Sequence, residues 1–196
     1  HHPDIGGIYP GSMTPEAKKL DDEGIIFDNF KIRMNDLTKH ERLQKKLNSG
    51  KYPARNPELN IQDITAQAAA NKIGEIQLRK IIDYYGLEVV LKQMYAIQEN
   101  ANEACLGILK NIKASSFDMT LDNFYLKLRI NTCSDGKKIN FDFTGSSGES
   151  SDNFNAPLPI TKAVIIYVLR CLINEDIPLN SGILEPVEIT TDSNSI

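Results

Sequence analysis

The sequence predicts an α+β protein, with helices in the middle of the chain and a small sheet after them. Apolar residues recur every three or four positions across residues 57–113, which is the spacing of helices with one buried face. From residue 121 the spacing changes to every second position, as in half-buried strands. We therefore expect a long antiparallel helical hairpin, a small antiparallel sheet with a buried helix, and a loop-rich N-terminal segment.

The bulk composition is that of an ordinary globular protein. Of the 196 residues, 41% are hydrophobic and 24% are charged, which argues against intrinsic disorder. The three cysteines are odd in number, far apart and set in apolar stretches, so we expect free thiols in a reduced, cytoplasmic protein. No stretch approaches the roughly 20 apolar residues of a membrane helix. There is neither a signal-peptide pattern nor an initiator Met, so we expect the sequence to begin inside a longer protein.

The charge pattern gives little reason to expect nucleic-acid binding. The formal net charge is −4, whereas proteins that bind polyanions usually carry a basic surplus. Basic residues do concentrate between Lys31 and Arg55, where an anion or an acidic partner is one interpretation. A solvated helix face is the other, and the scarcity of aromatic residues there favours it.

Residues 1–56 predict the loop-rich N-terminal segment. Gly and Pro interrupt every periodic pattern up to residue 35, leaving one short strand near residues 25–32. Thr38 is expected to cap a helix that ends near Asn48, and Glu41, three residues after Thr38, would complete a capping box.

Residues 57–113 and 114–196 form the other two expected segments. In the first, Gly86 separates two helices, of which the second has the stronger apolar stripe. In segment 114–196, apolar residues alternate with polar ones on both sides of a turn at 134–137, which predicts a β-hairpin. Residues 163–173 are apolar nearly all round and predict a buried helix, and a last short strand is expected at 187–191.

His1, His2 and Asp4 place two imidazoles and a carboxylate within four residues. This donor set suits zinc, manganese or iron. Three ligands so close in sequence rarely complete a site, and the remaining histidine, His40, lies in the basic segment. Two histidines at a terminus are also what the stub of a purification tag leaves, and composition alone does not choose between these interpretations.

Four blocks of the sequence resemble segments of the hydantoinase B / 5-oxoprolinase family, in the same order. The blocks are HHPDIGG with PGSM at residues 1–13, DITAQAAANKIG at 63–74, DFTGSS with NAP at 142–157, and DIPLNSG with a later proline at 176–186. Together they cover nearly the whole chain. The first block includes both histidines, which favours native residues over a tag.

The resemblance implies a fragment of a B-type component of an ATP-dependent enzyme that opens a hydantoin or 5-oxoproline ring. ATP would be bound by an A-type partner protein or domain, and a divalent transition metal by the B-type part, with His1, His2 and Asp4 in or beside its site. The family's B-type part is longer, so flanking segments are expected on both sides, and this chain alone is expected to be inactive. An oligomer without nucleic acid or membrane is expected.

Three further positions are candidate substrate contacts. Gln67 and Asn71 lie four residues apart on one helix face, so their amides either bind substrate or tie the helix to a neighbouring loop. Asn180 either contacts substrate or forms, with Gly182, a tight turn that needs a positive φ. The segment 144–148 either offers N–H groups to an anion or is a plain turn. The rival function is a non-catalytic scaffold that docks a partner through the helical hairpin.

Overall fold

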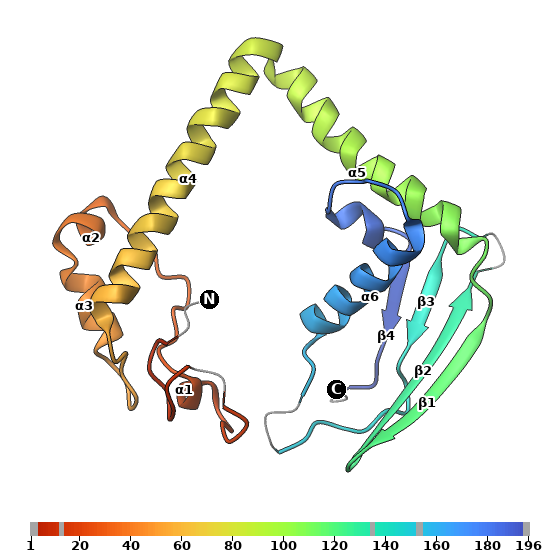
Figure 1. Ribbon diagram of the computed structural model, residues 1–196, viewed down its shortest axis with the longest axis horizontal. Coiled ribbons are helices and arrows are strands. Elements are labelled where there is room, and N and C mark those ends of the chain that lie inside the picture. The colour runs from red at the N-terminus through yellow and green to blue at the C-terminus, as the bar shows by residue number, and fades with distance from the viewer. Residues whose placement is uncertain (1–3, 12–13, 134–135, 152–154, 194–196) are drawn as a thin grey trace. The chain divides into compact units, whose positions relative to one another are not determined.

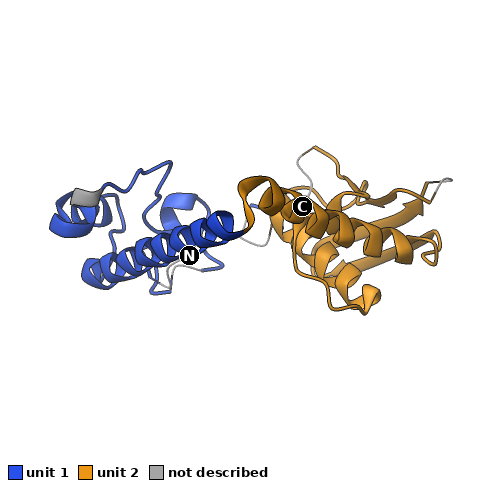
Figure 2. Ribbon diagram, turned by 90° about the horizontal axis from the view of Figure 1, so that it is seen from above, with its two compact units in different colours: residues 1–84, 151–154 blue, residues 85–150, 155–196 orange. Residues whose placement is uncertain are grey.

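The structure is a computed structural model that describes residues 4–11, 14–133, 136–151 and 155–193, with only the backbone at residues 34 and 35. It forms two compact units that divide between Tyr84 and Tyr85, and residue 151 lies with the first (Figure 2). The expected α+β class is confirmed. In chain order the elements are α1 (Leu20–Glu23), α2 (Met34–Lys39), α3 (Glu41–Leu47), α4 (Pro57–Tyr85), α5 (Leu87–Leu109), β1 (Ser115–Leu121), β2 (Phe124–Thr132), β3 (Ile139–Asp142), α6 (Leu158–Ile173), the 3-10 helix η1 (Ser181–Leu184) and β4 (Val187–Thr190) (Figure 1).

The first unit is built on packing between α3 and the start of α4. Leu43 and Leu47 of α3 are fully buried, and they share a cluster with Ile61 and Ile64 of α4. Burying side chains of this size stabilises a fold by about 1.5–3 kcal/mol each. The cluster therefore fixes the first turns of α4, which hold the candidate site.

The N-terminal segment differs from expectation in two places. The predicted single helix from Thr38 is two helices, because His40 adopts a left-handed φ of 59° between α2 and α3. Thr38 lies inside α2, so the predicted capping box is wrong. The strand predicted near residues 25–32 is also wrong: that described stretch is irregular, because Phe27 and Phe30 pack edge to face at 5.4 Å against the α3–α4 cluster.

An ion pair joins α2 to α3. Arg42 donates from Nε to Oδ1 of Asp36 at 2.9 Å and from Nη2 to Oδ2 at 2.7 Å, and the Arg33 backbone N–H donates to Oδ2 at 2.7 Å. The hydrogen bonds from Arg42, followed by that from Arg33, lower the pKa of Asp36 to about 2. The Arg42 guanidinium also lies 4.1 Å from the ring centroid of Phe30, so the pair is tied to the aromatic packing.

The second unit contains a four-stranded sheet in the order β1-β2-β3-β4 (Figure 1). The predicted hairpin is confirmed as β2 and β3, which pair antiparallel, with Arg129 opposite Asp142. β1 was not predicted, although Phe117, Met119 and Leu121 alternate with polar residues in the sequence; all seven of its residues are exposed in the structure. The sheet is also mixed rather than antiparallel. The chain returns through α6 and η1 before β4, and such a crossover allows β4 to pair in parallel with β3.

The core of the second unit lies between the helices and the sheet. It contains Ala101, Cys105 and Leu109 from α5, Ile139 and Phe141 from β3, Ile165, Leu169 and Ile173 from α6, and Ile177 and Ile183 near η1. α6 was expected to be buried all round, but only one stripe is: Tyr167 is 71% exposed and Val164 57%. The helix packs through one face, and no described residue covers the other.

The cysteines agree with the prediction of free thiols. Cys105 is buried in this core, and desolvation raises the pKa of its thiol to about 11. Cys133 and Cys171 are exposed and also free.

The two long helices are present, and Gly86 joins them with a φ of 85°. They belong to different units, so their antiparallel packing stays a prediction, as do the three expected segments 1–56, 57–113 and 114–196. Among the described helices, none combines the length and apolar character needed to span a bilayer.

Replacing Asp36 by Asn should destabilise the first unit most at neutral pH. A carboxylate whose pKa is lowered by folding stabilises the folded state above its unfolded pKa of about 3.9. That contribution is lost as the pH falls towards 2, the folded pKa. Urea unfolding should therefore show a larger difference in unfolding free energy between wild type and Asp36→Asn at pH 7 than at pH 3. The control is Asp83→Asn, at an exposed position of α4. An equal difference at both pH values would contradict the assignment.

Candidate functional site

Only part of the candidate metal segment is described. His1 and His2 lie outside the described residues, and Asp4 lies within them. Within the described ranges, no three His, Cys, Asp or Glu side chains gather closely enough to hold a metal ion. The metal assignment therefore stays a prediction. The structure defines what surrounds Asp4.

Two glycines after Asp4 form a turn that is pressed against other segments. Gly6 and Gly7 have φ angles of 98° and 90°, a region that residues with a Cβ rarely adopt. A Cβ on Gly6 would lie 2.1 Å from the carbonyl oxygen of Tyr52, and one on Gly7 would lie 2.7 Å from that of Glu23. The Gly7 N–H donates to the Tyr52 oxygen at 3.1 Å. The turn therefore requires glycine at both positions.

Arg55 joins Asp4 to this turn. Its Nη1 donates to Asp4 Oδ1 at 2.8 Å and to the Gly6 carbonyl at 3.0 Å, and its Nη2 donates to the Gly7 carbonyl at 2.7 Å. The Gly6 N–H donates to the same Asp4 oxygen at 3.0 Å. The carboxylate is thus held in one orientation. This arrangement suits a group that orients a metal site as well as one that binds the metal itself.

The start of α4 holds the backbone of Asp4. Asn56 caps the helix, accepting from the Leu59 N–H at 3.2 Å. One turn later, Asn60 is 3% exposed, and its Nδ2 donates to the Asp4 carbonyl at 2.9 Å. Arg55 and Asn60 thus fix Asp4 through its side chain and its backbone. Neither residue was predicted to belong to the site, because no local pattern links them to a segment about fifty residues earlier.

Gln67 and Asn71 lie further along α4 and are exposed. Neither amide hydrogen-bonds to any residue in the described part of the chain. The structure therefore gives no support to a tie between this helix face and a neighbouring loop. A contact with substrate stays a prediction for both residues.

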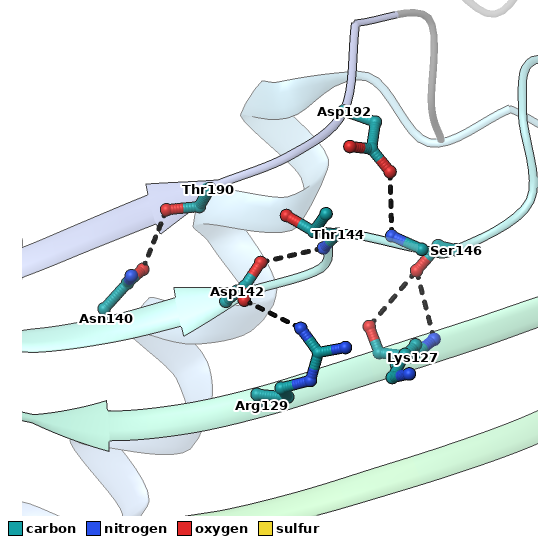
Figure 3. A network of polar contacts seen from close by, with 9 residues as sticks. Lys127, Arg129, Asn140, Asp142, Thr144, Ser146, Thr190 and Asp192 are labelled. Carbon is teal, nitrogen blue, oxygen red and sulfur yellow. Dashed lines mark hydrogen bonds and ion pairs between the residues drawn. The ribbon is translucent and has the colours of Figure 1, made fainter.

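The segment after β3 is a closed turn rather than an anion site. Its four successive N–H groups, from residues 144–147, all have partners within the protein. Thr144 donates to Asp142 Oδ1 at 2.9 Å, and Gly145 donates to Asp192 Oδ2 at 2.7 Å (Figure 3). Ser146 and Ser147 donate to the carbonyls of residues 143 and 125 at 3.1 and 2.8 Å. No N–H in this run is left for a phosphate or carboxylate, which favours the plain turn.

The serine hydroxyls of this turn continue the pairing of β2 beyond the end of β3. Ser146 Oγ accepts from the Lys127 N–H at 3.0 Å and donates to the Lys127 carbonyl at 3.1 Å (Figure 3). Ser147 Oγ accepts from the Tyr125 N–H at 2.8 Å. The DFTGSS block therefore has a structural explanation, because its hydroxyls satisfy backbone groups that β3 is too short to reach.

Asn180 also uses its amide within the protein. Its Oδ1 accepts from the Gly182 N–H at 2.8 Å, and its Nδ2 lies 3.1 Å from the Pro178 carbonyl and 3.3 Å from that of Ile97 in α5. These contacts favour the structural role over substrate binding, which stays a prediction. The expected positive φ at Gly182 is wrong. Glycine is needed there because a Cβ would lie 2.0 Å from the carbonyl oxygen of Gln98.

Gly182→Ala should therefore destabilise the protein by about 3 kcal/mol, since a methyl group forced against backbone strains a packed contact. Gly107→Ala in α5 is the matched control. No atom lies within 4 Å of a Cβ there, and alanine should stabilise the helix by about 0.5–1 kcal/mol. Urea unfolding of both variants measures the two effects. Equal stabilities would contradict the close approach of η1 to α5.

Comparisons with known proteins agree with these motifs. The family described as Hydantoinase B/oxoprolinase matches residues 1–196. The 5-oxoprolinase 1 of Arabidopsis thaliana is 36% identical over 220 residues, which cover 100% of this chain and 17% of that protein. The 5-oxoprolinase of Saccharomyces cerevisiae is 36% identical over 209 residues, with 100% and 16% covered. This chain thus spans about one-sixth of the length of these relatives.

A solved structure shares the fold. The crystal structure of the ATP-dependent caprolactamase from Pseudomonas jessenii superposes with a TM-score of 0.67 at 18% identity, covering 97% of this chain and 33% of that one. At this identity the likeness concerns the fold alone. On the family match and the relatives that are 36% identical along its whole length, the chain belongs to the hydantoinase B/oxoprolinase family.

Proposed function

We propose that this chain is part of the B-type component of an ATP-dependent hydrolase that opens the cyclic amide of 5-oxoproline. The observation that carries the proposal is the whole-length match to the family, in which three relatives named 5-oxoprolinase are 36–37% identical. A relative from Pseudomonas sp. that is named as a component of a D-/L-hydantoinase is 26% identical, so a hydantoin is the second candidate substrate. ATP would be bound by an A-type partner.

Two features of the described residues fit a divalent metal near Asp4. Its carboxylate is held in a fixed orientation by Arg55 and by the Gly6 N–H. The Asp4 carbonyl accepts from the buried Asn60, whose amide oxygen has no partner among the described residues. A carboxylate such as that of Asp4, together with the imidazoles of His1 and His2, is a donor set that zinc, manganese and iron accept.

A metal in that place would polarise the amide carbonyl and lower the pKa of bound water. The described residues would fix the position of Asp4. Arg55 neutralises the Asp4 carboxylate and bonds to the carbonyls of Gly6 and Gly7, so the carboxylate has one orientation. Such pre-organisation lowers the entropic cost of assembling a site.

A non-catalytic scaffold is the alternative function, and the exposed apolar side chains of α4 and α5 favour it. Ile73 is 60% exposed, Tyr84 80% and Tyr95 72%. Large apolar side chains that stay exposed on each of these helices are what a protein-binding surface would offer. A scaffold of this kind would bind its partner without needing any metal.

Metal analysis of the complete protein, purified with its A-type partner, separates the two functions. We expect stoichiometric zinc, manganese or iron, and ATP-dependent hydrolysis of 5-oxoproline. His2→Ala combined with Asp4→Ala should remove the metal and lower kcat/KM by at least about 100-fold, because both a ligand and its support are lost. The control is His40→Asn, because asparagine tolerates the left-handed backbone at this position. This variant should keep the metal and the wild-type kcat/KM. Ring opening that persists in a metal-free double variant would contradict the metal-dependent mechanism. A complete protein that neither holds a metal nor opens the ring would favour the scaffold.

A further inference from the structure

The first unit contains a small cleft between residues 21–26 and residues 46–52. Its volume is about 220 Å³, whereas drug-sized ligands occupy pockets of about 300–1,000 Å³, so the cleft suits a smaller molecule. Ile25 and Ile26 give it an apolar wall, and Asp21, Lys46 and Lys51 bring charged groups to it. An apolar wall with a few charged or polar groups is the usual construction of a small-molecule site.

Two lysines of the basic segment between Lys31 and Arg55 meet at this cleft. Elsewhere in the segment, the guanidinium groups of Arg42 and Arg55 are paired with carboxylates. Lys46 is half-buried, and its ammonium has no hydrogen-bond or ion-pair partner in the described part of the chain. Beside an apolar wall, such an ammonium attracts an anion more strongly than it would in bulk water, because the local dielectric constant is lower.

Lys51 supplies the second positive charge. Its Nζ lies 4.7 Å from the centroid of the Tyr52 ring. A hydrogen bond with the Tyr52 side chain raises the pKa of the Lys51 ammonium, and the charge of Asp22 adds to the effect, so Lys51 is cationic at neutral pH. Asp22 itself accepts from the backbone N–H groups of Lys18 and Lys19 at 3.2 and 3.1 Å. The Lys51 ammonium therefore stays available to a ligand.

Asp21 brings a hydrogen-bond acceptor of the opposite charge to the same cleft. Within the described ranges, its carboxylate forms no ion pair with Lys46 or Lys51, although all three line the cleft. A carboxylate repels a plain anion such as phosphate, but it accepts a hydrogen bond from an N–H group. The cleft therefore favours a ligand that carries both a carboxylate and an N–H.

The two walls of the cleft are also the segments that hold the turn after Asp4. On one wall, the Ile25 N–H donates to the Ile5 carbonyl at 2.9 Å. On the other, the Tyr52 carbonyl accepts from the Gly7 N–H at 3.1 Å. The cleft and the turn next to Asp4 are thus positioned by the same backbone.

We propose that this cleft binds a cyclic amide that carries a carboxylate: Lys46 and Lys51 bind the carboxylate, Asp21 accepts from the ring N–H, and Ile25 contacts the apolar part of the ring. The choice of 5-oxoproline as this ligand rests on the proposed function, because that molecule carries a carboxylate next to a ring N–H. A hydantoin without a carboxylate would lose the contacts with both lysines. The cleft therefore selects 5-oxoproline between the two candidate substrates.

Equilibrium dialysis of labelled 5-oxoproline against the complete protein, without ATP, tests the assignment without requiring turnover. Lys46→Met and Lys51→Met should each weaken binding by at least about 10-fold, because each removes a charge-assisted hydrogen bond. With ATP and the A-type partner, both variants should raise KM for 5-oxoproline by a similar factor and leave kcat within a few-fold of wild type. Lys45→Met is the matched control, since Lys45 is an exposed neighbour on α3 that does not line the cleft.

Asp21→Ala separates this class of ligand from a plain anion. Removing the acceptor should weaken the binding of 5-oxoproline, whereas removing the negative charge should strengthen the binding of inorganic phosphate at the two lysines. A variant that binds both molecules more tightly would show an anion site only, and it would overturn the assignment of a cyclic amide.

The remaining outcomes separate the cleft from the proposed function. A complete protein that binds 5-oxoproline through both lysines and does not open it overturns the proposed function and supports the cleft. A protein that opens 5-oxoproline while the folded lysine variants keep the wild-type Kd and KM overturns the cleft alone. A protein that neither binds nor opens 5-oxoproline overturns both.

Discussion

The guanidinium of Arg55 is the group on which the arrangement near the N-terminus depends. Its two terminal nitrogens meet the Asp4 carboxylate and the carbonyls of Gly6 and Gly7, three acceptors that a lysine could not span with one nitrogen. Because Arg55 stands two residues before α4, its position follows from the burial of the first turns of that helix against α3. The core of the first unit thus determines where Asp4 lies.

The four blocks shared with the family have different physical roles. The first carries the chemistry that we propose. The third closes the sheet, since Ser146 and Ser147 satisfy backbone groups of β2. The fourth docks η1 on α5 through Asn180 and a glycine that leaves no room for a Cβ. The second lies on α4, where Gln67 and Asn71 are exposed and stay candidates for contacts with substrate.

Long periodic elements could be predicted from sequence, and elements decided by distant contacts could not. The amphipathic spacing located α4 and α5, and strand alternation located β2 and β3. The alternation at Phe117, Met119 and Leu121 could have located β1 as well, and it was overlooked. The break at His40 depends on a left-handed backbone that no sequence pattern around it indicates. α6 is apolar on a face that no described residue covers, so composition overstated its burial. Arg55 and Asn60 were missed because hydrogen bonds over fifty residues leave no local signal.

The central proposal is that the segment ending at Asp4 belongs to a metal centre with nitrogen and oxygen ligands. X-ray absorption at the zinc edge of the complete, zinc-loaded protein tests it most directly. We predict imidazole scattering with ligand distances of about 2.0–2.1 Å and a lower imidazole count in His2→Ala. A sulfur shell at about 2.3 Å would contradict the account, because it would place the metal on thiolates such as the exposed Cys133 or Cys171.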